Sequence, residues 1–269
     1  MTILRIDHLS KSYKTGGEAI SVLQDISMSA NSEEMVAVMG PSGSGKTTLL
    51  QLLSGIDIPD GGNIFIKNKD ICKLKQDEMA QFRRRHIGMI FQDFQLFDSL
   101  NVQENILLPL VIDEVDYELQ EQRLQYILEI LEIEQLKNKT VNEISGGQKQ
   151  RVAIGRALIQ NPDIVFADEP TGSLDMRSTK IVMEYMWKMS RELGVSFFIV
   201  THDVYTASFC NRVLLLRNGQ FIKEVSNKKN SLQKDRLQKE QYTVKNRKIF
   251  QDEIINMLHA LGGEEDEFF

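Results

Sequence analysis

A glycine-rich loop, GPSGSGKT at positions 40–47, places the tightest limits on what this chain can fold into. The apolar run from Met35 to Met39 precedes the loop and is typical of a short buried strand. After the loop, the leucines between positions 49 and 53 indicate a buried helix that ends at Gly55. A strand, a G-x-x-x-x-G-K-[S/T] loop and a helix, in this order, form the phosphate-binding unit of an α/β fold.

Each residue type in this loop suits the binding of a nucleoside triphosphate. Gly43 and Gly45 allow backbone N–H groups to turn inward around phosphate oxygens, and the following helix points its positive end at them. Lys46 is expected to reach the β- and γ-phosphates, and the Thr47 hydroxyl is expected to hold Mg²⁺. The predicted phosphate-binding residues are Gly40, Pro41, Ser42, Gly43, Ser44, Gly45, Lys46, Thr47 and Thr48.

A second apolar strand, IVFA at positions 164–167, ends on two carboxylates. Because a Mg-nucleotide site needs a carboxylate near the metal, best placed at the end of an adjacent parallel strand, we expect Asp168 to hold Mg²⁺ directly or through water. Glu169, one step further, can orient and deprotonate the attacking water. The alternative is that both acids only cap the end of a strand, and the phosphate loop argues against it.

Two more polar residues follow predicted strands. His202 comes just after FFIV (197–200), where it could contact the γ-phosphate, although a lone histidine more often has a structural role. Gln92 follows IGMIF (87–91) and by default would be a solvated loop residue.

A second glycine pair lies in NEISGGQKQR, at positions 142–151, and this segment has no counterpart of the loop lysine. Ser145, Gly146 and Gly147 begin a predicted helix, so they offer N–H donors and a positive helix end to a phosphate. An ordinary N-cap serine would explain Ser145 but would leave the two glycines unexplained.

Charge and hydropathy exclude two other classes of protein. Lys and Arg number 32 against 38 Asp and Glu, a net charge of −6, whereas a nucleic-acid binder normally shows the opposite balance. The longest strongly apolar stretch is Ile106 to Ile112, far short of the ~20 residues that cross a bilayer. The start of the chain shows no signal peptide, and Cys72 and Cys210 match no metal spacing, so a cytosolic protein with reduced thiols is expected.

The remaining patterns suggest how the chain is organised. A mostly helical lobe is expected from about 73 to 143, with Leu124, Ile127, Leu128 and Leu131 on one helix face. Residues 226–248 are expected to form a basic linker. Residues 249–269 are expected to form an amphipathic helix and an acidic tail, with the helix docked on its own domain in preference to a partner.

The motifs together resemble the ATP-binding subunit of an ABC transporter, in family order over residues 1–225. They are Tyr13 in KSYK, GPSGSGKTT, Gln92 in FQD, ISGGQ ending at Gln148, ADEP, SLD ending at Asp175, and His202 in THD. Ile144 stands where the family usually has leucine. The resemblance implies an α/β P-loop core with a mixed sheet, an N-terminal antiparallel β subdomain and an inserted α-helical subdomain.

The resemblance also implies a role for the second glycine pair. In the family, each ATP is sandwiched between the phosphate loop of one copy and the Ser145 segment of its partner. Tyr13 would stack on adenine, Gln92 would sense Mg²⁺, and Asp175 would communicate across the homodimer. The implied ATP contacts outside the loop are Tyr13, Gln92, Ser145, Gly146, Gly147, Gln148 and Asp175, with Glu169 and His202 catalytic and Thr47, Gln92 and Asp168 at the metal.

Three segments, FQDFQLFDSLNVQENILLPLVI, NEISGGQKQR and ADEPTGSLD, most closely resemble the lipoprotein-release and macrolide-export group of the family. Within that group, ENILLPL and the short helical tail ending near LGG resemble the bacitracin-type peptide-antibiotic exporters. This resemblance implies an ATPase at the cytoplasmic face of the membrane that drives a separate permease. Residues 95–112 are then expected to present apolar surface to the permease or to pack within the lobe. A lipoprotein-release, macrolide-export or cell-division role is the alternative.

ABC-type ATPases that act on nucleic acid are disfavoured by spacing. Repair enzymes insert a long coiled coil before the second glycine pair, but only residues 93–144 lie between Gln92 and Ser145. Ribosome-associated members carry two ATP sites in one chain, and a single phosphate loop is present. A regulatory module without hydrolysis is disfavoured because Glu169 and His202 are both present.

Overall fold

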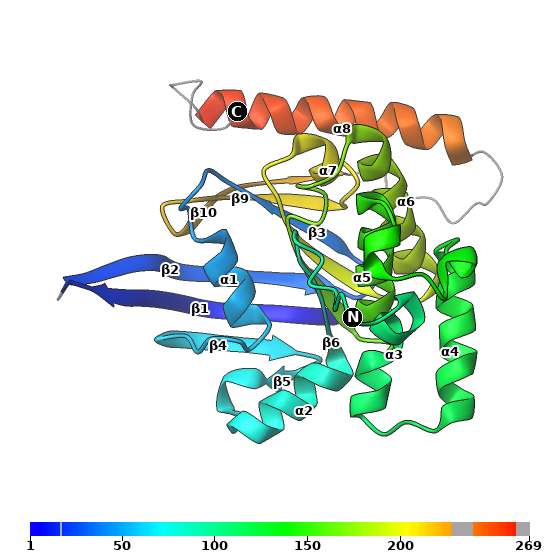
Figure 1. Cartoon of the computed structure of the whole chain (residues 1–269). Helices are drawn as coiled ribbons and strands as arrows, with labels where there is room; N and C mark the ends of the chain where they lie inside the picture. Colours follow the sequence, from blue (N-terminus) through cyan, green and yellow to red (C-terminus); the bar gives the residue numbers. More distant parts are fainter. Residues whose placement is uncertain (17, 228–238, 262–269) are drawn as a thin grey trace.

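The computed structural model describes residues 1–16, 18–227 and 239–261, and its centre is a mixed six-stranded sheet (Figure 1). The strand order is β10-β9-β3-β8-β7-β6, and only β10 runs antiparallel to its neighbour. The strands are β3 (Met35–Met39), β6 (Ile87–Ile90), β7 (Ile164–Asp168), β8 (Ser196–Val200), β9 (Arg212–Arg217) and β10 (Gln220–Ser226). The β9–β10 turn at Asn218 and Gly219 has positive φ at both residues, which is typical of a tight hairpin turn.

Helices cover both faces of this sheet. They are α1 (Lys46–Leu53), α2 (Gln76–His86), α3 (Val102–Ile112), α4 (Tyr117–Ile130), α5 (Gly146–Leu158), α6 (Met176–Glu192), α7 (Val204–Ala207) and α8 (Lys239–Leu261), with 3₁₀ turns at Ile71–Lys73, Glu134–Leu136 and Val141–Glu143. Residues of β3 alternate between two apolar cores: Val36 and Val38 pack with the leucines of α1, whereas Ala37 and Met39 pack with α5. Because successive strand residues point to opposite faces, α1 and α5 lie on opposite sides of the sheet. Figure 1 shows the same separation.

An antiparallel sheet of order β2-β1-β4-β5 forms the N-terminal subdomain. Its strands are β1 (Thr2–Thr15), β2 (Glu18–Asn31), β4 (Gly61–Ile66) and β5 (Lys69–Asp70). Tyr13 lies within β1 opposite Ile20 of β2, in a ladder that extends to Thr15 and Glu18.

The helical lobe begins later in the chain than the expected position 73. α2 directly precedes β6, and β6 pairs in parallel with β7 of the central sheet, so residues 76–90 do not form part of a separate lobe. The lobe helices are α3 and α4, which pack on α5. Leu124, Ile127, Leu128 and Leu131 are all buried, which confirms the predicted face of α4.

The C-terminal helix α8 starts at Lys239, ten residues inside the segment expected to be a linker. Its buried residues Phe250, Ile254, Met257 and Leu258 join the same core as α5 and α6, so the helix docks on its own domain. The rest of the expected linker and the acidic tail at 262–269 lie outside the described residues. Within the described part of the chain, no helix is long and apolar enough to cross a bilayer.

Candidate functional site

The phosphate loop joins the end of β3 to the start of α1, as the sequence predicted. Gly43 and Gly45 have φ of 76° and 101°, which L side chains rarely adopt. Space also demands glycine at Gly45, because an added Cβ would lie 2.8 Å from Leu23 Cδ2, and at Gly40, where it would collide with the Leu216 carbonyl oxygen. The φ angles and the close packing of these glycines therefore account for the tight shape of the loop without any contact to a ligand.

Lys46 folds over this loop. Its Nζ donates hydrogen bonds to the carbonyl oxygens of Gly40 (2.8 Å) and Pro41 (2.9 Å). Burial lowers the pKa of Lys46, and attraction from Glu169 and Asp168 opposes this shift. The buried Ser44 hydroxyl has no hydrogen-bond partner within the described chain. A half-buried ammonium and an unpaired hydroxyl on a loop of this shape suit an anionic, oxygen-rich ligand.

Asp168, the last residue of β7, lies beside the start of α1. A hydrogen bond connects its carboxyl to the Thr47 side chain, and Lys46 attracts it. Burial raises the pKa of Asp168 nevertheless, and repulsion from Glu169 adds to the rise. Ionised Asp168 is thus under-compensated, which is the environment that a bound cation would relieve.

Glu169 and His202 meet at the end of β8. His202 Nδ1 lies 2.9 Å from Glu169 Oε1, and the Thr201 hydroxyl donates to Glu169 Oε2 at 3.3 Å. Glu169 has a φ of 46°, and its backbone N–H donates to the Val200 carbonyl oxygen. The His202 side chain is 69% exposed whereas that of Glu169 is 15% exposed, so this pair connects the sheet edge to solvent. Thr201 is not among the residues predicted from the sequence to form this site.

Gln92 is exposed after β6 and lies against the loop that follows Glu169. An added Cβ on Gly172 would be 3.0 Å from Gln92 Nε2, and the Ser173 hydroxyl donates to the Gln92 carbonyl oxygen at 3.2 Å. Both Gly172 and Ser173 stand in the TGSLD stretch, and sequence reasoning assigned them no contact with Gln92. The structure therefore brings Gln92 to the same loop as the carboxylates.

Tyr13 is fixed by a network that sequence reasoning did not find. Its hydroxyl donates to Asp57 Oδ2 at 2.7 Å, and Lys11 Nζ lies 2.9 Å from Asp57 Oδ1 and 5.0 Å from the Tyr13 ring centroid. Burial raises the pKa of Asp57, but the hydrogen bonds from Tyr13 and Lys11 outweigh burial and leave it below its usual value. Tyr13 also interacts with the Thr48 side chain, which connects it to the phosphate loop.

Ser145 caps α5 with a capping box. The Gln148 side chain accepts from the Ser145 backbone N–H at 2.8 Å, and Ser145 Oγ accepts from the Gln148 N–H. Gly147 packs closely on α6, because an added Cβ would be 3.0 Å from Ser178 Oγ and 3.1 Å from Ser178 Cβ. At Gly146 an added Cβ would meet only ordinary contacts, the nearest at 3.6 Å. Packing within the described residues therefore does not explain Gly146.

Asp175 caps the neighbouring helix, α6. Its carboxylate accepts from the backbone N–H groups of Arg177 and Ser178 and from the Ser178 hydroxyl. Those side-chain and backbone hydrogen bonds from Ser178 lower the pKa of Asp175. Because Ser178 also packs on Gly147, Asp175 and the Ser145 segment form one local unit.

The phosphate loop and the Ser145 segment do not form one site within a single chain. The loop leads into α1, which packs on β7, β8 and β2, while Ser145 opens α5, which packs on α3, α6 and β6. These helices cover opposite faces of the sheet. Interactions at the phosphate loop connect Lys46, Thr47, Asp168 and Glu169, with His202 in contact with Glu169. Gln92 reaches the loop that follows Glu169.

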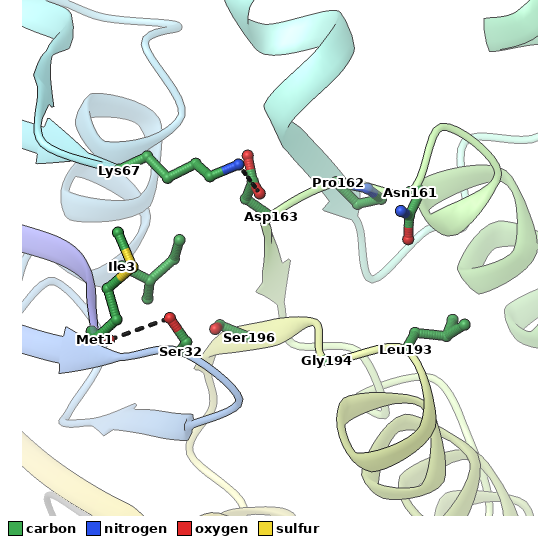
Figure 2. A pocket seen from close by; sticks show the side chains of 10 residues that line it. All are labelled: Met1, Ile3, Ser32, Lys67, Asn161, Pro162, Asp163, Leu193, Gly194 and Ser196. Carbon is green, nitrogen blue, oxygen red and sulfur yellow. Dashed lines mark hydrogen bonds and ion pairs between the residues drawn. The ribbon is translucent and has the colours of Figure 1, made fainter.

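A cavity of about 140 Å³ lies away from this site (Figure 2). It lies at the amino ends of β7 and β8, between Asp163 and Ser196, whereas the phosphate loop follows the carboxyl end of β3. Lys67 reaches Asp163 across it, with 2.8 Å between Nζ and Oδ1, and His86 Nδ1 lies 2.6 Å from Asp163 Oδ2. Asp163 thus has partners within the protein in Lys67 and His86. The cavity differs in this respect from the phosphate site, where the Ser44 hydroxyl has no partner within the described chain.

Comparison with known proteins decides the family. The family model described as "ABC transporter" matches residues 23–172, more than half of the chain. The chain belongs to the ABC transporter family. The match runs from β2 to the loop after Glu169, so it includes the phosphate loop, Gln92 and the Ser145 segment.

Two relatives of this ABC protein extend the match. The ABC transporter ATP-binding protein YxdL of Bacillus subtilis is 42% identical, over 98% of this chain and 96% of YxdL. The bacitracin export ATP-binding protein BceA of Halalkalibacterium halodurans is 43% identical, over 82% of this chain and 87% of BceA.

A solved structure gives the same fold. The ATP-binding cassette MJ0796 of Methanocaldococcus jannaschii, a dimer in a post-hydrolysis state bound to ADP and Pi, matches with a TM-score of 0.76. It is 36% identical, and the match covers 83% of this chain and 98% of that chain. The P-loop core, antiparallel subdomain and helical lobe of this ABC protein are thereby confirmed as those of an ATPase cassette, and the chain is an ATP-binding, ATP-hydrolysing subunit of an ABC-type transporter.

Replacement of Asp168 by asparagine is expected to stabilise this ABC ATPase in the absence of nucleotide. In the folded chain the pKa of Asp168 is raised above its ordinary value of 3.8. In the pH window between the ordinary and the raised value, Asp168 of the folded chain therefore keeps a proton that the unfolded chain has lost. The free energy of unfolding therefore falls as the pH rises through that window, and the loss persists at pH 7. We therefore expect Asp168→Asn to melt at a higher temperature than the wild type at pH 7.

The measurement is calorimetry in EDTA, and the gain should shrink as the pH approaches 4. Asp93→Asn, at an exposed position shortly after β6, is the matched control and should leave the melting temperature unchanged. An unchanged or lower melting temperature for Asp168→Asn at pH 7 would show that the buried charge is not a cost.

Proposed function

We propose that two copies of this chain close around two molecules of Mg-ATP and that their closure and reopening drive a separate membrane permease. The observation that carries this proposal is the placement of the phosphate loop and the Ser145 segment on helices at opposite faces of the sheet. A helix N-terminus with two glycines suits a phosphate, and Gly146 is not explained by packing within the chain. In this arrangement, the phosphate that binds the Ser145 segment belongs to the ATP held by the second copy.

Contacts in the structure support a proposed role for each residue of the site. Lys46 and the loop N–H groups bind the β- and γ-phosphates, and Tyr13, held by Asp57, stacks on adenine. Glu169 takes the proton of the attacking water, and its contact with His202 Nδ1 leaves the other ring nitrogen of His202 for the γ-phosphate. Asp175, which shares Ser178 with the Ser145 segment, communicates between the two copies.

Thr47, Asp168 and Gln92 would hold Mg²⁺, which neutralises charge on the phosphate oxygens. The donor set fits the ion, because hydroxyl, carboxylate and amide oxygens are the ligands that Mg²⁺ accepts. Burial raises the pKa of Asp168, and a nearby cation would favour its ionised form and oppose that rise. Gln92 lies against Gly172, so a change at the metal also reaches the segment that leads to Asp175.

The cargo we propose is a peptide antibiotic directed at the cell wall, of the bacitracin or lantibiotic type. The support is the likeness to the bacitracin export protein BceA, together with the ENILLPL and LGG segments of the sequence. The permease would dock at the cytoplasmic face of the membrane. Phe97, Val111 and Ile112 are each more than half exposed, and they provide apolar surface for that contact.

Deletion of this ATPase from a cell that encodes it is expected to increase sensitivity to bacitracin or lantibiotics, measured as a lower minimal inhibitory concentration. A copy of the wild-type gene should restore resistance, whereas Glu169→Gln should not, because continued protection requires turnover. Equal amounts of both proteins in the cell are the necessary control.

Unchanged peptide sensitivity together with a lipoprotein-sorting or division defect would move the assignment to another transporter group. In that case the shared-site ATP chemistry would stand, since it is tested separately with the purified protein.

A further inference from the structure

Helix α8 packs over the segment that carries His202. Figure 1 shows it lying across the top of the molecule, next to α7 and over β9 and β10. Phe250 and Ile254 are 1% and 0% exposed and share a core with Ala207 and Phe209. The family model ends at residue 172, so it does not include this contact.

Arg247 makes the most specific part of that contact. Its guanidinium carbon lies 4.1 Å from the ring centroid of Phe209 and 5.9 Å from that of Tyr205. The two rings form an edge-to-face pair, with centroids 5.4 Å apart and planes at 77°. A cation over such rings is attracted by their negative faces, and Arg247 therefore connects α8 to both ends of one short turn.

This turn, α7, depends on tertiary contacts for its shape. With only four residues it is too short to be stable on its own. Asp203 caps it by accepting from the N–H groups of Tyr205 (2.9 Å) and Thr206 (3.0 Å). Asp203 directly follows His202, so the position of α7 sets the backbone from which His202 projects.

Hydrogen bonds continue from α7 to Glu169. The hydroxyls of Thr206 and Thr171 lie 2.8 Å apart in a buried position, and Thr171 is two residues after Glu169. The Asp203 N–H donates to Thr201 Oγ1, whose hydroxyl donates to Glu169. His202 itself is largely exposed and has few contacts that could hold it from the solvent side. Its alignment with Glu169 is therefore governed by α7.

We propose that Arg247 is a positioning residue for ATP hydrolysis: by stacking on Phe209 and Tyr205 it holds α7, and through α7 it aligns His202 with Glu169. The inference rests on the proposed roles of Glu169 and His202. It gives the C-terminal helix a function in the reaction that is separate from the docking of the permease.

The first test uses histidine NMR on the full-length chain without nucleotide. The chain has four histidines, so a His202→Ala spectrum identifies the His202 ring signal. Arg247→Ala should shift or broaden that signal and leave those of His8 and His86, on other elements, in place. Lys248→Ala, the next and exposed cation of α8, is the matched control and should leave the His202 signal unchanged.

The second test is steady-state ATPase kinetics. Arg247→Ala should lower kcat about three- to ten-fold, as expected for the loss of one partly buried cation–π contact, with KM for ATP within about two-fold of wild type. Lys248→Ala should match wild type. Phe209→Leu, which removes the ring from the other side of the contact, should lower kcat similarly, and Arg247→Ala in that background should add little.

An unmoved His202 signal or an unchanged kcat in Arg247→Ala would overturn the proposal. A variant in which only the melting temperature falls would overturn it as well, because Arg247 would then have a structural role alone. If Arg247→Ala does not fold, Phe209→Leu decides by the same two readings. Failure of the proposed function gives a different pattern, in which Glu169→Gln still hydrolyses ATP while the NMR result is unaffected.

Discussion

Replacement of Glu169 by glutamine is expected to reduce ATP turnover at least ~10²-fold, the usual cost of removing a general base, while Mg-ATP still binds. Glutamine keeps the size of the side chain and can still contact His202 and Thr201, so the loop should retain its shape. Because binding is proposed to close the dimer and hydrolysis to reopen it, the variant should accumulate as an ATP-bound dimer. Phosphate release gives the rate, and size-exclusion chromatography with ATP gives the oligomeric state.

Glu118→Gln is the matched control, since Glu118 is exposed in the first turn of α4, on the helical lobe. It should hydrolyse ATP at the wild-type rate and show no trapped dimer. Near-normal hydrolysis by Glu169→Gln would remove Glu169 from its proposed role. A variant that fails to bind ATP would instead assign Glu169 to the nucleotide site itself.

Lys46→Ala and Ser145→Ala should each be inactive as purified proteins, yet active when mixed. Lys46 is proposed to hold the ATP of its own copy, whereas Ser145 opens a helix on the opposite face of the sheet and is proposed to complete the site of the partner. A mixed dimer then has one intact site, formed by the loop of the Ser145→Ala copy and the Ser145 segment of the Lys46→Ala copy. With random pairing, the mixture should recover up to roughly a quarter of wild-type activity.

The control mixture combines Lys46→Ala with the Lys46→Ala/Ser145→Ala double variant, which cannot form an intact site. Differently tagged copies establish that mixed dimers form in both experiments. If tagged heterodimers are recovered from the first mixture and activity stays at the level of the control mixture, the shared-site arrangement is wrong.

The sequence by itself determined the core of the site. The phosphate loop, the strand before it and the helix after it are local patterns, because loop shape depends on glycines at fixed positions and the flanking elements on short-range apolar periodicity. The positions of Asp168, at the end of β7, and of Glu169 and His202, just beyond β7 and β8, follow from the same short apolar patterns, whereas their roles stay predictions. The capping box at Ser145 is also a local signal.

Only the tertiary structure decided which of these residues meet. The separation of α1 and α5 by the sheet depends on how β3 distributes its side chains between two cores, and no short stretch of sequence carries that information. The Tyr13–Asp57 bond and the packing of Gln92 on Gly172 join residues 44 and 80 positions apart.

The same reason explains the misplaced boundaries. β6 belongs to the central sheet because it pairs with β7, more than seventy residues later, and α8 begins at Lys239 where the charged composition predicted a linker. Local composition reports the preferences of a segment, but the free energy of burial against distant elements determines where that segment packs.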